Sequence, residues 1–203
     1  IYVKMLDLPD VPDVGDKTVF HSFQPGATTK GLSWDASDEL DHKPLFDGKP
    51  FTGKVQYGLK DQEGKILRID SVNYHKNGEF LYSYELNDGY KHQERWSVGD
   101  GKYIELKYYP NVKHWVERVR GTREITVSVR GRVGLVEKEQ KIYDLKDKLI
   151  YHKKEGRVIL DDLANKELID PPTAPETNPS EKPSIKKRVL NSSEHDWSKG
   201  LAP

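Results

Sequence analysis

Three groups of side chains in this 203-residue sequence are of types that could do chemistry. The first is a set of seven histidines, of which His75, His92 and His114 fall on consecutive candidate strands. Histidines that converge can bind a metal ion, but the spacing of a helical zinc motif is absent. We expect histidines on solvent-exposed strand surfaces and no cofactor, and we keep a metal site as the alternative.

Carboxylates form the second group. The segment "DASDELDH" (35–42) gathers four of them beside a histidine. A calcium loop needs a glycine for its sharp turn, and that glycine is missing. The segment is therefore predicted to be the solvated start of one helical turn near residues 33–39, where acidic side chains suit the free N–H groups. Four glutamates on candidate strands are expected on the solvated face: Glu85, Glu94, Glu105 and Glu117.

Arginines form the third group, in "ERVRGTREITVSVRGR" (117–132). Their alternation predicts a basic strip that would contact an anionic ligand or a lipid headgroup: Arg118, Arg120, Arg130 and Arg132. The alternative is that these charges protect an edge strand from pairing with another sheet. No nucleophile elbow, phosphate-binding loop or dinucleotide fingerprint occurs, so no catalytic residue is assigned.

The elements that must position these residues are strands. Between residues 47 and 160, turn signals such as "KNGE", "NDGY" and "GDGK" recur at intervals of roughly 8 to 13 residues, which suits a strand plus a tight turn. Apolar residues alternate between the turns with the period of a strand, not of a helix. We predict a mainly β fold, an antiparallel β-meander with strands at 79–86, 102–109 and 124–130.

The same alternation predicts the core and the turns. Buried positions are expected at Tyr82, Tyr84, Trp96, Leu106 and Val127, because each lies on the apolar parity of its strand or at a repeated aromatic position. Tight turns with glycine at positive φ are expected at 77–78 and 88–89.

The flanks of this domain differ from it in composition. Residues 1–46 are predicted to be an irregular N-terminal arm with a short strand near 18–23, and residues 47–168 the β-repeat domain, with a short helix around 160–168. Residues 169–203 are predicted to be a disordered, extended, proline-rich tail, because such a segment buries too little surface to offset its conformational entropy. Trp197, with Leu190 and Leu201 on either side, is the expected partner anchor in the tail.

Residues 48–111 contain two units that can be laid over each other, with Gly64–Lys65 falling on Gly101–Lys102 and Tyr57 close to Trp96. The shared pattern resembles the variant MORN repeat of bacterial antitoxin-like proteins. The matching residues are Gly48, Gly53, Val55, Tyr57, Gly64, Lys65, Tyr74, Asn77 and Gly78, then Gly89, His92, Trp96, Gly101, Lys102 and Tyr109. Gln93 and Pro110 depart from the pattern. The resemblance implies a scaffold or recognition role.

Composition argues against some classes of function and excludes some kinds of site. Basic and acidic residues number 33 each, which argues against a dedicated nucleic-acid binder. Cysteine is absent, which excludes disulfides and thiolate metal sites. No apolar run reaches the length of a membrane span. The first residue is Ile1, so an N-terminal segment either has been removed or is absent from the sequence as given. A removed leader is the interpretation we favour, with a place in the cell envelope or outside the cytoplasm.

We therefore expect a non-catalytic β-repeat protein that binds or scaffolds a partner protein as a subunit of a larger complex. The alternative is a cell-envelope accessory protein that binds an anionic lipid or glycan through the basic strip, with peripheral membrane contact. A hydrolase that uses strand carboxylates is a third hypothesis.

Overall fold

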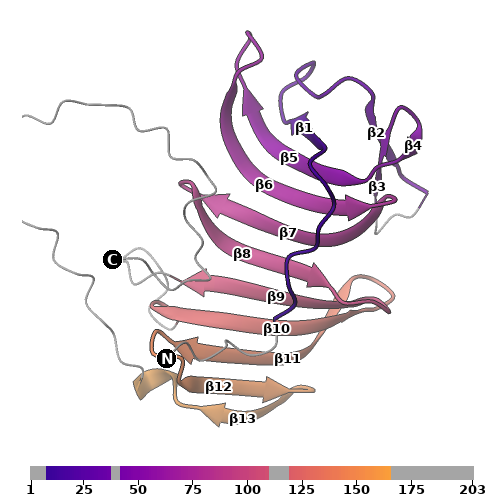
Figure 1. Cartoon of the computed structure of the whole chain (residues 1–203). Coiled ribbons are helices and arrows are strands. Elements are labelled where there is room, and N and C mark those ends of the chain that lie inside the picture. The colour runs from indigo at the N-terminus through magenta and orange to yellow at the C-terminus, as the bar shows by residue number, and fades with distance from the viewer. Residues whose placement is uncertain (1–7, 38–41, 110–118, 166–203) are drawn as a thin grey trace, which may run out of the picture.

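A computed structural model describes residues 8–37, 42–109 and 119–165. The chain is mainly β and antiparallel, as predicted, and its described strands form two sheets (Figure 1). The larger sheet has ten strands, in this spatial order: β1 (Thr18–Ser22), β5 (Gly53–Lys60), β6 (Ile66–Lys76), β7 (Glu79–Asn87), β8 (Tyr90–Ser97), β9 (Lys102–Tyr109), β10 (Thr122–Arg130), β11 (Leu135–Asp144), β12 (Leu149–Lys154) and β13 (Arg157–Asp161).

From β5 to β13 the strands follow chain order, so this part of the sheet is a simple meander. The predicted strands at 79–86, 102–109 and 124–130 are confirmed as β7, β9 and β10. The predicted tight turns are also confirmed. Asn77 and Gly78 have φ of 51° and 80°, and Asp88 and Gly89 have φ of 51° and 83°. Two successive positive φ values match the type I′ turn whose twist suits a hairpin.

The N-terminal region is more ordered than an irregular arm. Its predicted short strand is β1, which pairs in parallel with β5 and so belongs to the main sheet. A second sheet contains β2 (Leu32–Asp35), β3 (Lys43–Phe46) and β4 (Lys49–Pro50). The helical turn predicted near 33–39 is wrong at its start, because residues 33–35 belong to the strand β2. The Asp35 carboxylate accepts a hydrogen bond from the Ser37 N–H at 3.0 Å, as expected of a capping residue. Residues 38–41 lie outside the described part.

The register gives the large sheet two different faces. One face, here called the arm face, carries the row Lys54, Tyr74, Tyr82, Trp96, Ile104 and Val127 across β5 to β10. The other, here called the trough face, carries the row Val55, Asn73, Ser83, Arg95, Glu105 and Thr126. One face is therefore mostly apolar and the other mostly polar.

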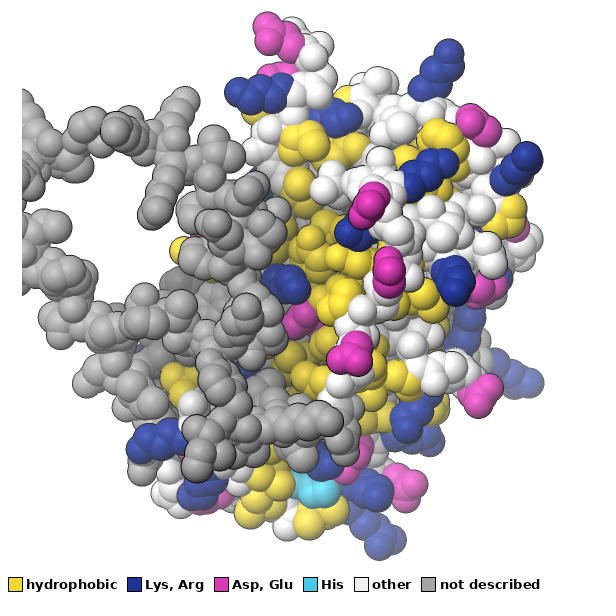
Figure 2. All heavy atoms as spheres, in the orientation of Figure 1, with side chains coloured by type: hydrophobic (Ala, Val, Ile, Leu, Met, Phe, Trp, Pro, Cys, Tyr) yellow, Lys and Arg dark blue, Asp and Glu magenta, His cyan; other side chains and the backbone are white. Residues whose placement is uncertain are grey.

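The central core lies on the arm face. Tyr82, Trp96, Leu106 and Tyr108 are buried there, and Leu8 of the N-terminal segment packs against them. In Figure 1 the indigo segment leading into β1 crosses in front of this face, and Figure 2 shows apolar side chains gathered beside it. Of the five predicted core residues, three are buried, whereas Tyr84 and Val127 are partly buried.

Two smaller clusters close the ends of the sheet. Val19, Phe51 and Val55 pack with Leu32, Trp34 and Phe46, so the second sheet covers the β1–β5 end of the trough face. At the other end, Ile142, Ile150 and Tyr151 pack with Leu163 of the 3₁₀ turn η1 (Leu163–Asn165). That turn lies within the predicted helix at 160–168, whose remainder after residue 165 is outside the described part. The middle of the trough face stays open between the two clusters.

Candidate binding surfaces

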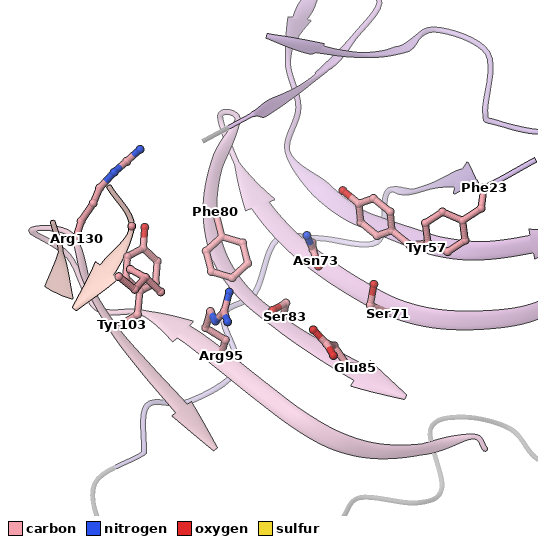
Figure 3. Close-up of a pocket in the computed structure, with 12 residues that line it drawn as sticks. Phe23, Tyr57, Ser71, Asn73, Phe80, Ser83, Glu85, Arg95, Tyr103 and Arg130 are labelled. Carbon is pink, nitrogen blue, oxygen red and sulfur yellow. The ribbon is translucent and has the colours of Figure 1, made fainter. Parts of the chain in front are cut away.

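A hollow of about 590 Å³ lies on the trough face (Figure 3). Its lining runs from Tyr57 on β5 to Arg130 on β10. Strands lie about 4.8 Å apart, so these two strands would be about 24 Å apart in a flat sheet. One hollow touches both because the sheet curves around it. This hollow, here called the trough, has a volume within the range of ligand sites.

Small polar side chains form the floor of the trough. Ser71 and Asn73 project from β6, and Ser83 projects from β7 directly opposite Asn73 in the register. Figure 3 shows them on one side of the sheet with Glu85 and Arg95 beside them. Among the described residues, the side chains of Ser71, Asn73 and Ser83 form no hydrogen bond with one another or with their neighbours. The floor thus presents unfilled donors and acceptors.

Next to this floor lies a saturated ionic network centred on Glu105. Its Oε2 accepts hydrogen bonds from Arg95 Nε at 2.9 Å and from Gln93 Nε2 at 3.0 Å, while Lys107 Nζ lies 3.0 Å from Oε1. Burial raises the pKa of the Glu105 carboxyl, but the hydrogen bonds from Arg95 and Lys107 outweigh burial and lower it. Glu105 is therefore ionised at neutral pH and holds the Arg95 guanidinium in place.

Aromatic rings stand at both ends of the trough. At the β5 end, Tyr57 lies 5.4 Å from His21 and 6.1 Å from Trp34 between ring centroids, and Phe23 extends the same group. At the β9 end, Phe80 and Tyr103 lie 6.4 Å apart. Burial raises the pKa of the Tyr57 hydroxyl, so Tyr57 is a neutral donor at physiological pH. The trough therefore offers a polar floor between two aromatic ends.

The second candidate surface is the open edge of the large sheet at β13. Every residue of β13 is exposed, and its centre is apolar: Val158 is 55% exposed, Ile159 61% and Leu160 36%. In the described part of the chain, β13 pairs with β12 alone. A register shift between His152 and Lys153 leaves Ile159 as an extra residue in the pairing, so β13 carries a bulge.

The opposite edge of the sheet, at β1, is capped. Phe20 N donates to Thr29 Oγ1 at 2.8 Å, and Ser22 N donates to Thr28 Oγ1 at 3.1 Å. The Phe20 carbonyl accepts from Thr29 N at 2.8 Å. These side-chain bonds occupy backbone groups that would otherwise pair with another strand. The β1 edge is therefore capped by hydrogen bonds, whereas the β13 edge is exposed.

Glu94 is not on the solvated face, contrary to the prediction. It has the same parity as Trp96 and so lies on the arm face, where it is 4% exposed. The Tyr82 hydroxyl donates to its Oε1, and Lys91 Nζ lies 3.4 Å from the same oxygen. Burial, then Glu94 itself, raises the pKa of Tyr82. Of the other three glutamates, Glu85 is exposed and Glu105 is partly buried, and Glu117 lies outside the described residues.

The fold does not bring the arginines of the predicted basic strip together on one surface. Arg120 precedes the start of β10 and Arg130 ends it, so a whole strand of roughly 30 Å separates them. Arg130 lines the trough, and Arg132 is exposed in the following turn. The edge-strand alternative is wrong for this segment, because β10 lies between β9 and β11. Four further predicted partner residues lie outside the described part: Arg118, Leu190, Trp197 and Leu201.

The histidines do not converge in the part of the chain that the structure describes, which holds no group of three potential metal ligands. His92 lies 3.6 Å from Glu85, and His75 is buried with both ring nitrogens unpaired. His114 falls in the segment 110–118, which is not described.

Sequence reasoning missed the trough floor and the β13 edge. A partial signal for the floor was present, because Ser83 and Glu85 alternate with Tyr82 and Tyr84 and so had to share the opposite face. No local sequence pattern predicts the sheet curvature that turns that face into a hollow. The position of β13 at the sheet edge depends on the pairing of all the other strands.

Comparison of the chain with protein-family models, curated proteins and solved structures found no match. The resemblance to variant MORN repeats therefore stays a prediction. Within the described residues, no helix has the length and apolar character needed to cross a membrane.

Proposed function

We propose that the protein is a non-catalytic binding protein that works as a subunit of a larger assembly, docking a partner protein along the β13 edge of its sheet. The observation that carries the proposal is the contrast between the two edges. Thr28 and Thr29 cap β1, whereas β13 exposes three apolar side chains in a row. An exposed apolar edge strand is a template for pairing with a strand of another chain.

The partner expected from this edge is a short extended segment with apolar side chains. Main-chain hydrogen bonds to β13 would supply affinity, and Val158, Ile159 and Leu160 would select apolar neighbours. Arg157 and Asp161 flank this apolar centre with opposite charges. The bulge at Ile159 limits the length of regular pairing, so a segment of a few residues suits the edge better than a long strand.

The alternative function, recognition of an anionic lipid or glycan by arginines, has less support. It requires one continuous basic surface, and β10 separates Arg120 from Arg130 by its full length. The Arg95 guanidinium, which lines the trough, is bound to Glu105.

Affinity capture from the native source tests the proposal with a matched pair of variants. Ile159→Lys places a charge on the open edge, and Val133→Lys places the same charge on an exposed residue of the turn between β10 and β11. We expect a stoichiometric partner to bind the wild-type protein and Val133→Lys but to be lost by Ile159→Lys. Equal capture by all three proteins, each folded by circular dichroism, would contradict docking at β13.

The same assay tests the predicted anchor in the tail. If residues 169–203 wrap the partner, Trp197→Ala should weaken capture without changing the melting temperature of the β domain. Unchanged capture after removal of 171–203 would show that the tail adds nothing, and the binding surface would then have to be sought on the sheet.

A further inference from the structure

We infer that the trough is a binding site for an uncharged oligosaccharide. This inference is independent of the docking function, because it rests on a face of the sheet that the β13 edge does not share.

The floor offers groups that match sugar hydroxyls. Ser71, Asn73 and Ser83 are half-buried, and among the described residues their side chains have no hydrogen-bond partner. A serine hydroxyl and an asparagine amide each both donate and accept, as a sugar hydroxyl does. Because no described side chain engages these half-buried groups, a ligand that replaces the water around them can form hydrogen bonds with them. The floor therefore suits a ligand dense in hydroxyl groups.

The aromatic ends suit the apolar C–H faces of pyranose rings. Phe23 and Tyr57 stand at one end, and Phe80 and Tyr103 at the other. Tyr57 and Tyr103 come from strands four steps apart, about 19 Å in a flat sheet and less in this curved one. A single sugar ring is too short to reach both ends. The spacing thus points to a chain of several sugars.

The charges around the floor favour a neutral ligand. Glu105 holds the Arg95 guanidinium, and Glu85 adds a negative charge to the lining. Arg130, at the β10 end, is engaged in an interaction of its own. Among the described residues that line the trough, both arginines are engaged, so an anionic chain would meet Glu85 without an unengaged cation to balance its charge.

A peptide is a poorer fit to the trough than to the β13 edge. The floor is made from the faces of β6 and β7, interior strands that already pair with a neighbour on both sides. A peptide in the trough could not extend the ladder and would depend on side-chain contacts alone.

Titration calorimetry of the full chain with neutral hexasaccharides tests the inference. The probes are cellohexaose, maltohexaose, mannohexaose and chitohexaose, with an oligogalacturonate of equal length as the anionic comparison. Two variants remove one feature each, Asn73→Ala from the floor and Tyr103→Ala from the aromatic end. Asn87→Ala removes an exposed asparagine outside the trough as the matched control.

We expect at least one neutral hexasaccharide to bind in preference to the oligogalacturonate. Asn73→Ala and Tyr103→Ala should each raise its Kd roughly tenfold or more, whereas Asn87→Ala should change it less than about twofold. Amide and side-chain NMR shifts should move at Asn73 on titration. Absence of binding to every neutral probe, preference for the anionic one, or affinity untouched by both trough variants would overturn the inference. The docking function at β13 would stand in each of these cases.

Discussion

Single residues show that the two faces of the sheet accommodate charge in different ways. On the arm face, the buried Glu94 carboxylate has two polar neighbours, the Tyr82 hydroxyl and Lys91, amid aromatic rings. On the trough face, Glu105 collects donors from Arg95, Gln93 and Lys107. Burying a charge is costly unless it is paired and hydrogen-bonded, so each network offsets the cost of burying its carboxylate. The first network lies within the core, and the second borders the floor of the trough.

Trp96 is the residue whose truncation should cost most on the arm face. It is 4% exposed and packs 5.3 Å from the Tyr82 ring. Trp96→Ala should lower the free energy of unfolding by about 3–5 kcal/mol, the range for large aromatic truncations. Urea denaturation measures the change, with Val133→Ala as a control at a residue 96% exposed. An unchanged midpoint for Trp96→Ala would mean that the assigned register is wrong.

His75 should make stability depend on pH. Burial lowers the pKa of its imidazole to about 4 from the ordinary value of 6.5. The unfolded chain therefore binds more protons between these two values, and stability is complete above pH 6.5 and is lost as pH falls toward 4. The expected loss near pH 4.5 is about 2.5 kcal/mol.

Urea denaturation at about pH 7 and about pH 4.5 checks this expectation in the wild type and in His75→Phe. The variant cannot take up the proton, so its stability should fall less between the two conditions. The same fall in both proteins would place the titrating group elsewhere.

At the scale of elements, local patterns predicted the strands and their antiparallel meander, and the structure confirms both. They did not predict how the N-terminal strand joins the sheet. Alternation in 79–86, 102–109 and 124–130 is a local property, and β7, β9 and β10 confirm it. The parallel pairing of β1 with β5 joins segments more than thirty positions apart, as in the pair Thr18 and Lys54, and no local pattern encodes it. β-Bulges make it harder still to predict which residues share a face of the sheet. The shift between Glu85 and Leu86 changes which residues share a face after that point.

The two repeated units also differ in a way the sequence did not reveal. Turns at Gly64–Lys65 and Gly101–Lys102 close alike, with Asp61 N donating to the Lys65 carbonyl and Val98 N to the Lys102 carbonyl, both at 3.0 Å. One strand, β7, lies between the units β5–β6 and β8–β9, so the second unit runs in the opposite direction. Tyr57 consequently lies on the trough face and Trp96 on the arm face. The same pattern supplies a ring that lines the trough once and a core ring once.

The turn between β6 and β7 gives a prediction at this scale. Gly78 has φ of 80°, so Gly78→Val forces a β-branched residue into a left-handed conformation at a cost of about 1–3 kcal/mol. Glu79→Val removes only an exposed ion pair with Lys43, worth about 0–1 kcal/mol. In thermal denaturation, the melting temperature of Gly78→Val should therefore be well below that of Glu79→Val. Equal melting temperatures would argue against this hairpin.

For the whole molecule, the sheet has two different ends and two different faces. The arm face is packed under the N-terminal segment, the trough face is hollowed, the β1 edge is capped, and the β13 edge exposes apolar side chains. A polar composition is compatible with this fold, because the buried apolar residues form one cluster on the arm face and two at the ends of the trough face, and the middle of the trough face is polar. The capped edge limits strand addition to one end, so docking at β13 would give a defined complex, not a fibre.

Amide hydrogen exchange on the full chain, alone and with its captured partner, tests docking at β13 most directly. We predict that residues 157–161 exchange rapidly in the isolated protein, as exposed edge amides do, and become protected in the complex. The amides of β1 should exchange slowly in both states, because Thr28 and Thr29 already bind them. Protection that appears elsewhere in the complex and leaves 157–161 as fast as in the isolated protein would contradict docking at this edge.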